Sequence, residues 1–284
     1  MKGLRKLGSI VVMLALVLGI TGAVAPVKQA SASTKKSYVM IKGEKAKVSI
    51  LFIGSLTSVK SSKSSVVSVK KIGSNKIKLT AKKTGKAVIN VRGKYGYGRY
   101  TITVKKNKFS CNVKGVYSTG YGAGYIYYEL VNKCGDYISS ATMKYDIVDI
   151  NGNVLKSAEE SLYSLVPNAK MYSSIYVSGD LVSQGAANIK VKSFKIKHDM
   201  LLGYKNYSSK VAVSYNKATG AVTFKNKASK YVSAKADVVF YDAAGNVVDV
   251  QYATAYLSGK GKDTKTVSSS KQYTDVKVFK RAYA

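Results

Sequence analysis

Short runs of alternating apolar and polar residues constrain the fold of this chain most strongly. Three such runs span residues 76–80, 87–91 and 100–104, with turn residues between them. Alternation of period two places the apolar side chains of a strand on one face, so each sheet must bury that face against another sheet. Tyr, Val, Ile, Thr and Ser are plentiful, Trp is absent and only two Pro occur, which favours strands. The sequence therefore predicts an all-β fold of packed sandwiches.

The first 32 residues have the three regions of a secretory signal peptide. Basic residues precede an apolar run over residues 10–20, and Ala-Ser-Ala at 30–32 fits the small-x-small cleavage pattern. The alternative is a membrane anchor, but a spanning helix needs about 20 apolar residues. We expect a secreted protein that begins at Ser33, has no transmembrane segment when mature, and is extracellular or associated with the cell wall. The last residues show no LPxTG-type sorting signal, so we expect any retention to be non-covalent.

The mature length suits two or three domains. We place a signal peptide at 1–32 and domains at 33–106, 107–200 and 201–284. Residues 61–69 form a Ser-rich turn that leads into VVSV, and residues 80–91 read TAKKTGKAVINV. With these motifs, residues 36–106 resemble the bacterial Ig-like domain of group two (BIG). The resemblance implies an Ig-like β-sandwich of the kind that serves as a spacer or adhesive module on bacterial surfaces, without catalytic residues.

The remainder of the chain contains a repeat with a spacing of about 93 residues, which indicates a domain duplication. The repeated unit is a strand, a D-x-x-G-N turn, and a second strand that ends at a Leu. Its landmarks are Tyr137, Asp149 and Leu165 in the first copy, and Tyr231, Asp242 and Leu257 in the second. Residues 239–248 resemble the FxLYD family of small extracellular β-domains. The first copy is less similar to that family, so the expectation is two related β-sandwich domains.

The D-x-x-G-N segments also suggest calcium, because Asp149, Asn151 and Asn153 alternate as oxygen ligands would. A calcium loop needs six or more oxygens including a bidentate acid, and the second copy has Ala243 and Ala244 inside the turn, where ligands would fall. We therefore expect hairpin turns in which Gly and Asn accept a positive φ, and no metal.

Few residues are suited to catalysis. His198 is the only histidine and no G-x-S-x-G motif surrounds a serine, so a Ser-His-acid triad lacks support. Glu159 and Glu160 are adjacent and would point to opposite faces of a strand, which does not make a facing acid pair. We expect no enzyme activity and no cofactor.

Cys111 and Cys134 are the only cysteines, and an even number in an exported chain indicates a disulfide. The two positions would lie opposite each other in a hairpin whose tip is Gly122-Ala123. An ideal two-residue loop would place them at the wider, hydrogen-bonded type of pair, so a bulge or a longer loop would be needed. We expect the disulfide.

Aromatic and basic residues are interleaved with glycines between two expected strands: Lys94, Tyr95, Tyr97, Arg99 and Tyr100. Exposed tyrosine rings beside cations would stack on sugars or bases. The alternative, which we favour, is a glycine-opened hairpin whose tyrosines cover the edge of the sandwich. Among the segments considered, this is the best-formed candidate contact surface.

Positive charge is concentrated in residues 33–106, where 19 basic residues face the single acid Glu44, for a net charge of +18. Nearly all of this charge is Lys, a flexible point charge that suits a diffuse polyanion. Nine lysines in turns or on the solvent side of a strand are the candidate contacts: Lys60, Lys63, Lys70, Lys71, Lys76, Lys78, Lys82, Lys83 and Lys86.

We therefore expect a non-catalytic secreted or cell-surface binding or scaffold protein. It would be held at the bacterial cell envelope by electrostatic contact with an anionic wall polymer such as teichoic acid or with another extracellular polyanion, and it would not recognise a specific nucleic acid. One alternative is an adhesin-like module that binds a glycan or a protein. Another is a secreted enzyme or inhibitor with an unrecognised site. If the protein binds no polyanion, its positive charge would serve only to keep it soluble.

Overall fold

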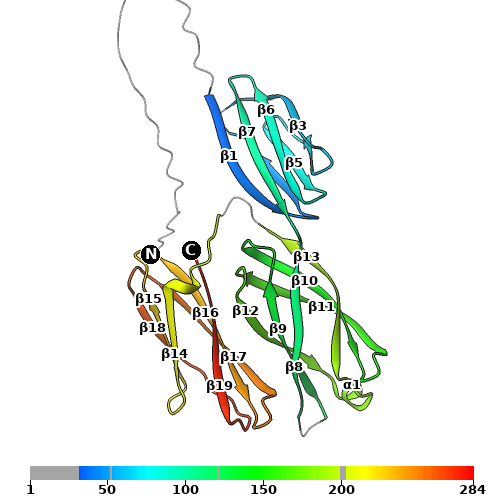
Figure 1. Ribbon diagram of the computed structural model, residues 1–284, viewed down its shortest axis with the longest axis vertical. Helices are drawn as coiled ribbons and strands as arrows, with labels where there is room; N and C mark the ends of the chain where they lie inside the picture. The colour runs from blue at the N-terminus through cyan, green and yellow to red at the C-terminus, as the bar shows by residue number, and fades with distance from the viewer. Residues whose placement is uncertain (1–31, 52, 120–121, 199–202) are drawn as a thin grey trace, which may run out of the picture. The chain divides into compact units, whose positions relative to one another are not determined.

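The computed structural model describes residues 32–51, 53–119, 122–198 and 203–284 (Figure 1). Within these residues the chain forms nineteen strands, one short helix α1 (Gly179–Ser183) and one 3₁₀ turn η1 (Ser208–Lys210). The all-β prediction is confirmed. The expected signal peptide lies outside the described residues except for Ala32. Among the described residues, no helix is long and apolar enough to cross a membrane.

The first pair of sheets is formed by β1 to β7. Its strands are β1 (Ala32–Ile41), β2 (Lys45–Ser49), β3 (Leu56–Ser61), β4 (Val67–Lys71), β5 (Lys76–Ala81), β6 (Gly85–Gly93) and β7 (Gly96–Lys105). One sheet has the order β1-β7-β6-β3 and the other β2-β5-β4. The three alternating runs expected as strands fall within β5, β6 and β7, and their apolar residues, such as Ile77, Ile89 and Ile102, share one buried core.

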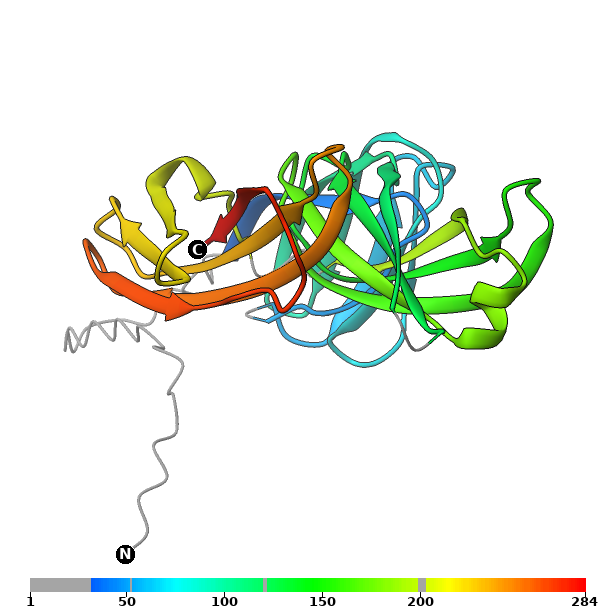
Figure 2. The ribbon, with the colours of Figure 1, turned by 90° about the horizontal axis from the view of Figure 1, so that it is seen from below.

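The second and third pairs of sheets have the same strand order. In the second pair, β12-β9-β8 packs with β11-β10-β13, and in the third, β18-β15-β14 packs with β17-β16-β19. The second pair comprises β8 (Phe109–Ser118), β9 (Gly124–Asn132), β10 (Ile138–Val148), β11 (Val154–Leu165), β12 (Lys170–Val177) and β13 (Asn188–Lys197). The third comprises β14 (Val211–Asn216), β15 (Ala221–Asn226), β16 (Val232–Tyr241), β17 (Val247–Leu257), β18 (Lys262–Thr266) and β19 (Asp275–Tyr283). The long strands β16 and β17 curve along their length (Figure 2).

The repeated D-x-x-G-N segments form the same hairpin turn, between β10 and β11 and between β16 and β17. Gly152 and Gly245 have positive φ angles of 85° and 83°, as expected for a glycine at this position. The asparagines do not share that conformation. Instead, the backbone N–H of Asn153 donates to Asp149 Oδ1 at 2.8 Å and its side-chain amide donates to Oδ2. Asn246 and Asp242 make the same two bonds.

The second and third pairs of sheets also share a buried asparagine, at the end of β9 and at the end of β15. The repeat recognised in the sequence did not include it. The amide nitrogen of Asn132 donates to the carbonyl oxygens of Asp136 and Leu165, and its Oδ1 accepts from the N–H of Cys134. Asn226 repeats this pattern in the third pair of sheets. A buried amide bonded to three backbone groups fixes where two connections turn, because unpaired backbone groups are costly to bury.

Aromatic residues join the second and third pairs of sheets. Tyr127 and Tyr172 from β9 and β12 form a buried cluster with Val239, Val247 and Val250 from β16 and β17. Lys271, in the loop before β19, reaches into this region. Its Nζ donates to the hydroxyl of Tyr127 at 2.5 Å and lies 3.9 Å from the ring centroid of Tyr117. Burial lowers the pKa of Lys271.

We expect Lys271→Met, which keeps the length of the apolar stem, to lower the free energy of unfolding by about 1–2 kcal/mol. The variant removes a partly desolvated cation–π contact and leaves the hydroxyl of Tyr127 without its donor. Urea denaturation followed by tyrosine fluorescence measures the change. The exposed Lys262 provides the control, since Lys262→Met should alter stability very little. Equal effects of the two substitutions would contradict the prediction.

Candidate functional site

The outer face of the sheet β2-β5-β4 carries a closely spaced group of lysines. Alternation turns Ile77 and Leu79 of β5 into the core and places Lys76 and Lys78 on the opposite face. The same parity exposes Lys45 and Lys47 on β2 and Lys70 on β4. We call these five residues the lysine face: Lys45, Lys47, Lys70, Lys76 and Lys78.

The strand register brings three of these lysines into one row. Lys78 of β5 lies directly opposite Lys47 of β2 on one side and opposite Lys70 of β4 on the other. Residues directly opposite on antiparallel strands have Cβ atoms about 4.5–5.5 Å apart, and like charges at such positions are destabilising. The other outward positions on these strands, Ser49, Ser68 and Thr80, are uncharged and offer no compensation.

The single acid of residues 33–106 does not neutralise this face. Glu44 is buried, and its Oε2 accepts from the backbone N–H of Ile41 at 2.9 Å and lies 3.1 Å from Nδ1 of His198. Among the described residues, the ion pairs of the protein include no lysine between positions 33 and 106. Since like charges stand together without a counter-charge, this face is suited to an anionic ligand.

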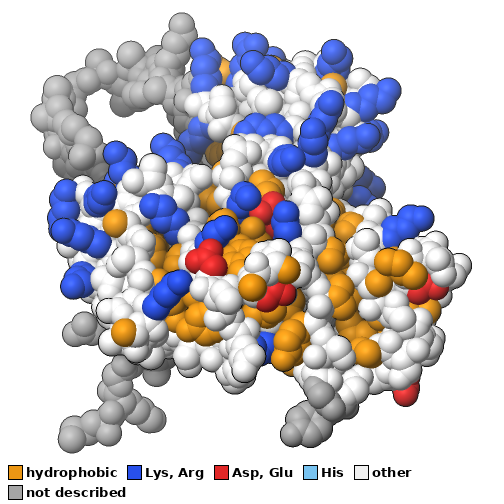
Figure 3. Space-filling view, turned by 60° about the horizontal axis from the view of Figure 1, so that its bottom comes forward, with side chains coloured by type: hydrophobic (Ala, Val, Ile, Leu, Met, Phe, Trp, Pro, Cys, Tyr) orange, Lys and Arg blue, Asp and Glu red, His pale blue; other side chains and the backbone are white. Residues whose placement is uncertain are grey.

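The structure separates the nine candidate lysines into groups. Lys70, Lys76 and Lys78 belong to the lysine face. Lys60 lies on β3 in the other sheet, and Lys71 donates from Nζ to the carbonyl oxygen of Leu56. The remaining four candidate lysines lie in turns or at the start of β6 and are exposed elsewhere on the surface: Lys63, Lys82, Lys83 and Lys86. On the side of the molecule in Figure 3, Lys and Arg are spread widely while Asp and Glu form a few small patches.

Lys45 and Lys47 were missing from the candidates, although the sequence held a signal for them. Residues 45–49 read KAKVS, in which Ala46 and Val48 alternate with polar residues. In the structure both apolar side chains pack against the core of the first pair of sheets, so the two lysines must point outward.

The tyrosine-rich hairpin is formed by β6 and β7, with Lys94 and Tyr95 in its turn. It does not bring the candidate residues onto one surface. Tyr97 and Arg99 are exposed, whereas the Tyr100 ring packs against the first core and lies 6.3 Å from the ring of Tyr38. Burial, and then the neighbouring Tyr38, raise the pKa of Tyr100.

The structure corrects the predicted register of the hairpin that holds the cysteines. Cys111 on β8 pairs with Leu130 on β9, and the register shifts at a bulge between Val113 and Gly115. Cys134 lies beyond the end of β9, where its Sγ accepts from the backbone N–H of Lys108. Neither cysteine is bonded in this structure, in which the register places Cys134 beside Lys108 rather than opposite Cys111, and the disulfide stays a prediction.

No protein-family model matches the chain, and no curated protein is significantly similar to it. The resemblances to the bacterial Ig-like and FxLYD domains therefore stay predictions. Among solved structures, the chain is similar to the mixed-linkage glucan utilization locus protein SGBP-B of Bacteroides ovatus, solved with a mixed-linkage heptasaccharide. The identity is 10%, the TM-score is 0.21, and the match covers 59% of this chain and 50% of that one.

Proposed function

We propose that this protein is a non-catalytic binding protein of the bacterial cell surface that holds an anionic wall polymer, such as teichoic acid, on its lysine face. One observation carries the proposal: Lys47, Lys78 and Lys70 stand in a row across three strands, with no acid beside them. A polyanion laid across the row would neutralise the charges that repel one another.

The chemistry of lysine fits a flexible polymer better than a small ligand. Each ammonium group is a point charge on a mobile stem, without the fixed fork by which Arg reads one phosphate. The face lies on a regular sheet, so neighbouring charges recur at the spacing between strands, about 4.8 Å. A chain of phosphates can contact several of them at once, and binding would depend on charge density and little on sequence or shape.

Salt dependence of binding by the full chain tests the proposal. If the five lysines of the face each contact one phosphate, the slope of log affinity against log salt should be about −3.5, by analogy with single-stranded nucleic acids. Affinity for purified wall teichoic acid would then fall roughly 100-fold between 50 and 200 mM salt. Polyethylene glycol, an uncharged polymer without sugar residues, serves as the control and should not bind. Binding to teichoic acid that ignores salt, or the absence of binding at low salt, would refute the proposal.

A further inference from the structure

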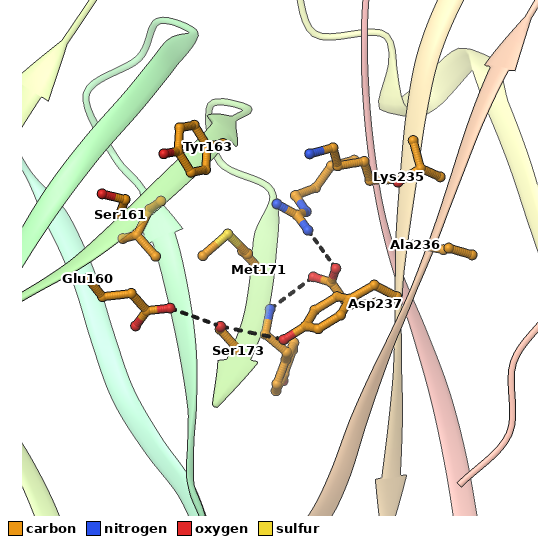
Figure 4. A pocket seen from close by; sticks show the side chains of 14 residues that line it. Glu160, Ser161, Tyr163, Met171, Ser173, Lys235, Ala236 and Asp237 are labelled. Carbon is orange, nitrogen blue, oxygen red and sulfur yellow. Dashed lines mark hydrogen bonds and ion pairs between the residues drawn. The ribbon is translucent and has the colours of Figure 1, made fainter. Parts of the chain in front are cut away.

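A cavity of about 200 Å³ lies between β11 and β12 of the second pair of sheets and β16, β17 and β19 of the third (Figure 4). Alternation along β16 turns Ala234 and Ala236 into the core of the third pair of sheets. It presents Lys235 and Asp237 to the cavity. The register then places Tyr252 of β17 opposite Asp237. The cavity therefore lies on the outer face of one sheet.

The third pair of sheets provides a buried ion pair with an unused donor. Asp237 is completely buried, and its Oδ1 accepts from Nη2 of Arg281 at 2.5 Å while its Oδ2 accepts from the backbone N–H of Tyr172 at 2.9 Å. Burial raises the pKa of Asp237, and the guanidinium of Arg281 opposes that shift. Arg281 is only 5% exposed, and its Nε has no hydrogen-bond partner among the described residues. Because the Nε atom is itself buried, the ion pair forms the closed base of the cavity and does not contact a ligand directly.

The second pair of sheets provides a carboxylate and a chain of hydroxyl groups. Glu160 accepts from the hydroxyl of Tyr128 at 2.7 Å and, at 3.4 Å, from Oγ of Ser173. That same Oγ accepts from the hydroxyl of Tyr252, also at 3.4 Å. Burial raises the pKa of Glu160. Bonds of 3.4 Å are long for hydroxyl groups, so these groups can exchange them for shorter bonds to a ligand.

The charged residues and the exposed tyrosines of the cavity limit the kinds of ligand that it can bind. Glu160 and Asp237 balance Lys235 and Arg281, so the cavity is neutral within a strongly basic protein. Tyr163 and Tyr252, which are 60% and 51% exposed, offer ring surface at the cavity. Acceptors, donors and aromatic faces together suit a ring that carries hydroxyl groups, since each hydroxyl both donates and accepts. The volume is below the roughly 300–1,000 Å³ of sites for drug-sized ligands, which limits the occupant to about one ring.

We propose that this cavity binds one neutral sugar residue, with Glu160 and Ser173 bonding its hydroxyl groups and Tyr163 and Tyr252 packing against its C–H face. The site is separate from the lysine face and does not depend on the function proposed for it. The lining has no net positive charge that would favour an anion.

Titration calorimetry of the full chain tests the proposal with methyl glucoside, methyl galactoside and N-acetylglucosamine, and with inorganic phosphate as the anionic probe. We expect at least one of the saccharides to bind at millimolar concentration or below, and phosphate not to compete with it. Tyr163→Ala combined with Tyr252→Ala should weaken that binding by about tenfold or more, on the scale of one lost stacking surface.

Tyr231→Ala is the matched control, because Tyr231 is also 60% exposed but does not line the cavity. It should leave saccharide affinity unchanged. Failure of all three saccharides to bind, competition by phosphate, or an equal loss in the control variant would overturn the proposal. Neutralising the lysine face should leave saccharide binding intact, so this site and the polyanion site can fail independently.

Discussion

Replacing Asp237 by Ala is expected to lower the free energy of unfolding by about 3–5 kcal/mol, the largest effect on stability that we predict. The carboxylate is completely buried and accepts from Arg281 and from the backbone of Tyr172. Its removal leaves the guanidinium charge buried without a counter-charge and one backbone N–H without its acceptor. Chemical denaturation of the full chain measures the change.

Two control variants separate the buried pair from a general effect of removing an acid. Asp263 pairs with Lys265 at 3.0 Å on the surface, so Asp263→Ala should cost about 1 kcal/mol or less. The double variant Asp237→Leu with Arg281→Met replaces both charges by apolar groups and should be less destabilised than Asp237→Ala alone. If the double variant is as unstable as the single one, the unpaired charge of Arg281 is not the source of the lost free energy of unfolding.

Replacing Lys47, Lys70 and Lys78 together by Gln is expected to weaken binding of teichoic acid about 100-fold at 0.1 M salt. Each contact that is lost removes the release of one counterion, which is worth about 0.7 of a decade at that salt concentration. The variant should fold at least as stably as the parent, because it removes two like-charged pairs between neighbouring strands. Binding to immobilised polymer and thermal unfolding measure the two effects.

The matched control is the replacement of Lys60, Lys82 and Lys86 by Gln. This variant loses the same charge from exposed positions outside the lysine face. Its affinity should stay within about tenfold of that of the parent. If the two triple variants lose affinity equally, net charge rather than the row of lysines governs binding, and the proposed site is wrong.

Local alternation was sufficient to predict the strands and the direction of many side chains. Ile77 and Leu79 are buried and Lys76 is exposed, as the period of two requires. The same reasoning predicted opposite faces for Glu159 and Glu160. Glu159 pairs with Lys144 at the surface, and Glu160 accepts from the buried Tyr128. These features depend on the backbone geometry of a few consecutive residues, which neighbouring residues determine.

Register and contact between sheets were decided by the tertiary structure. Cys111 lies opposite Leu130 because the whole hairpin is shifted from the predicted register. Gly115 and Tyr127, nearer the tip, already pair three positions away from it, and the bulge between Val113 and Gly115 adds one more. The positive charge of residues 33–106 was predicted from the sequence. Three of its lysines form a row only because Lys47 and Lys70 both pair with Lys78.

The sequence by itself therefore determined an all-β chain with a repeated turn and a strongly basic first part, since these follow from composition and short-range periodicity. Only the tertiary structure assembled the cavity between the second and third pairs of sheets. Glu160, Ser173, Asp237 and Arg281 come from four strands spread over more than a hundred residues. Their meeting depends on how two sheets pack, and packing is a property of whole surfaces that no short run of residues encodes.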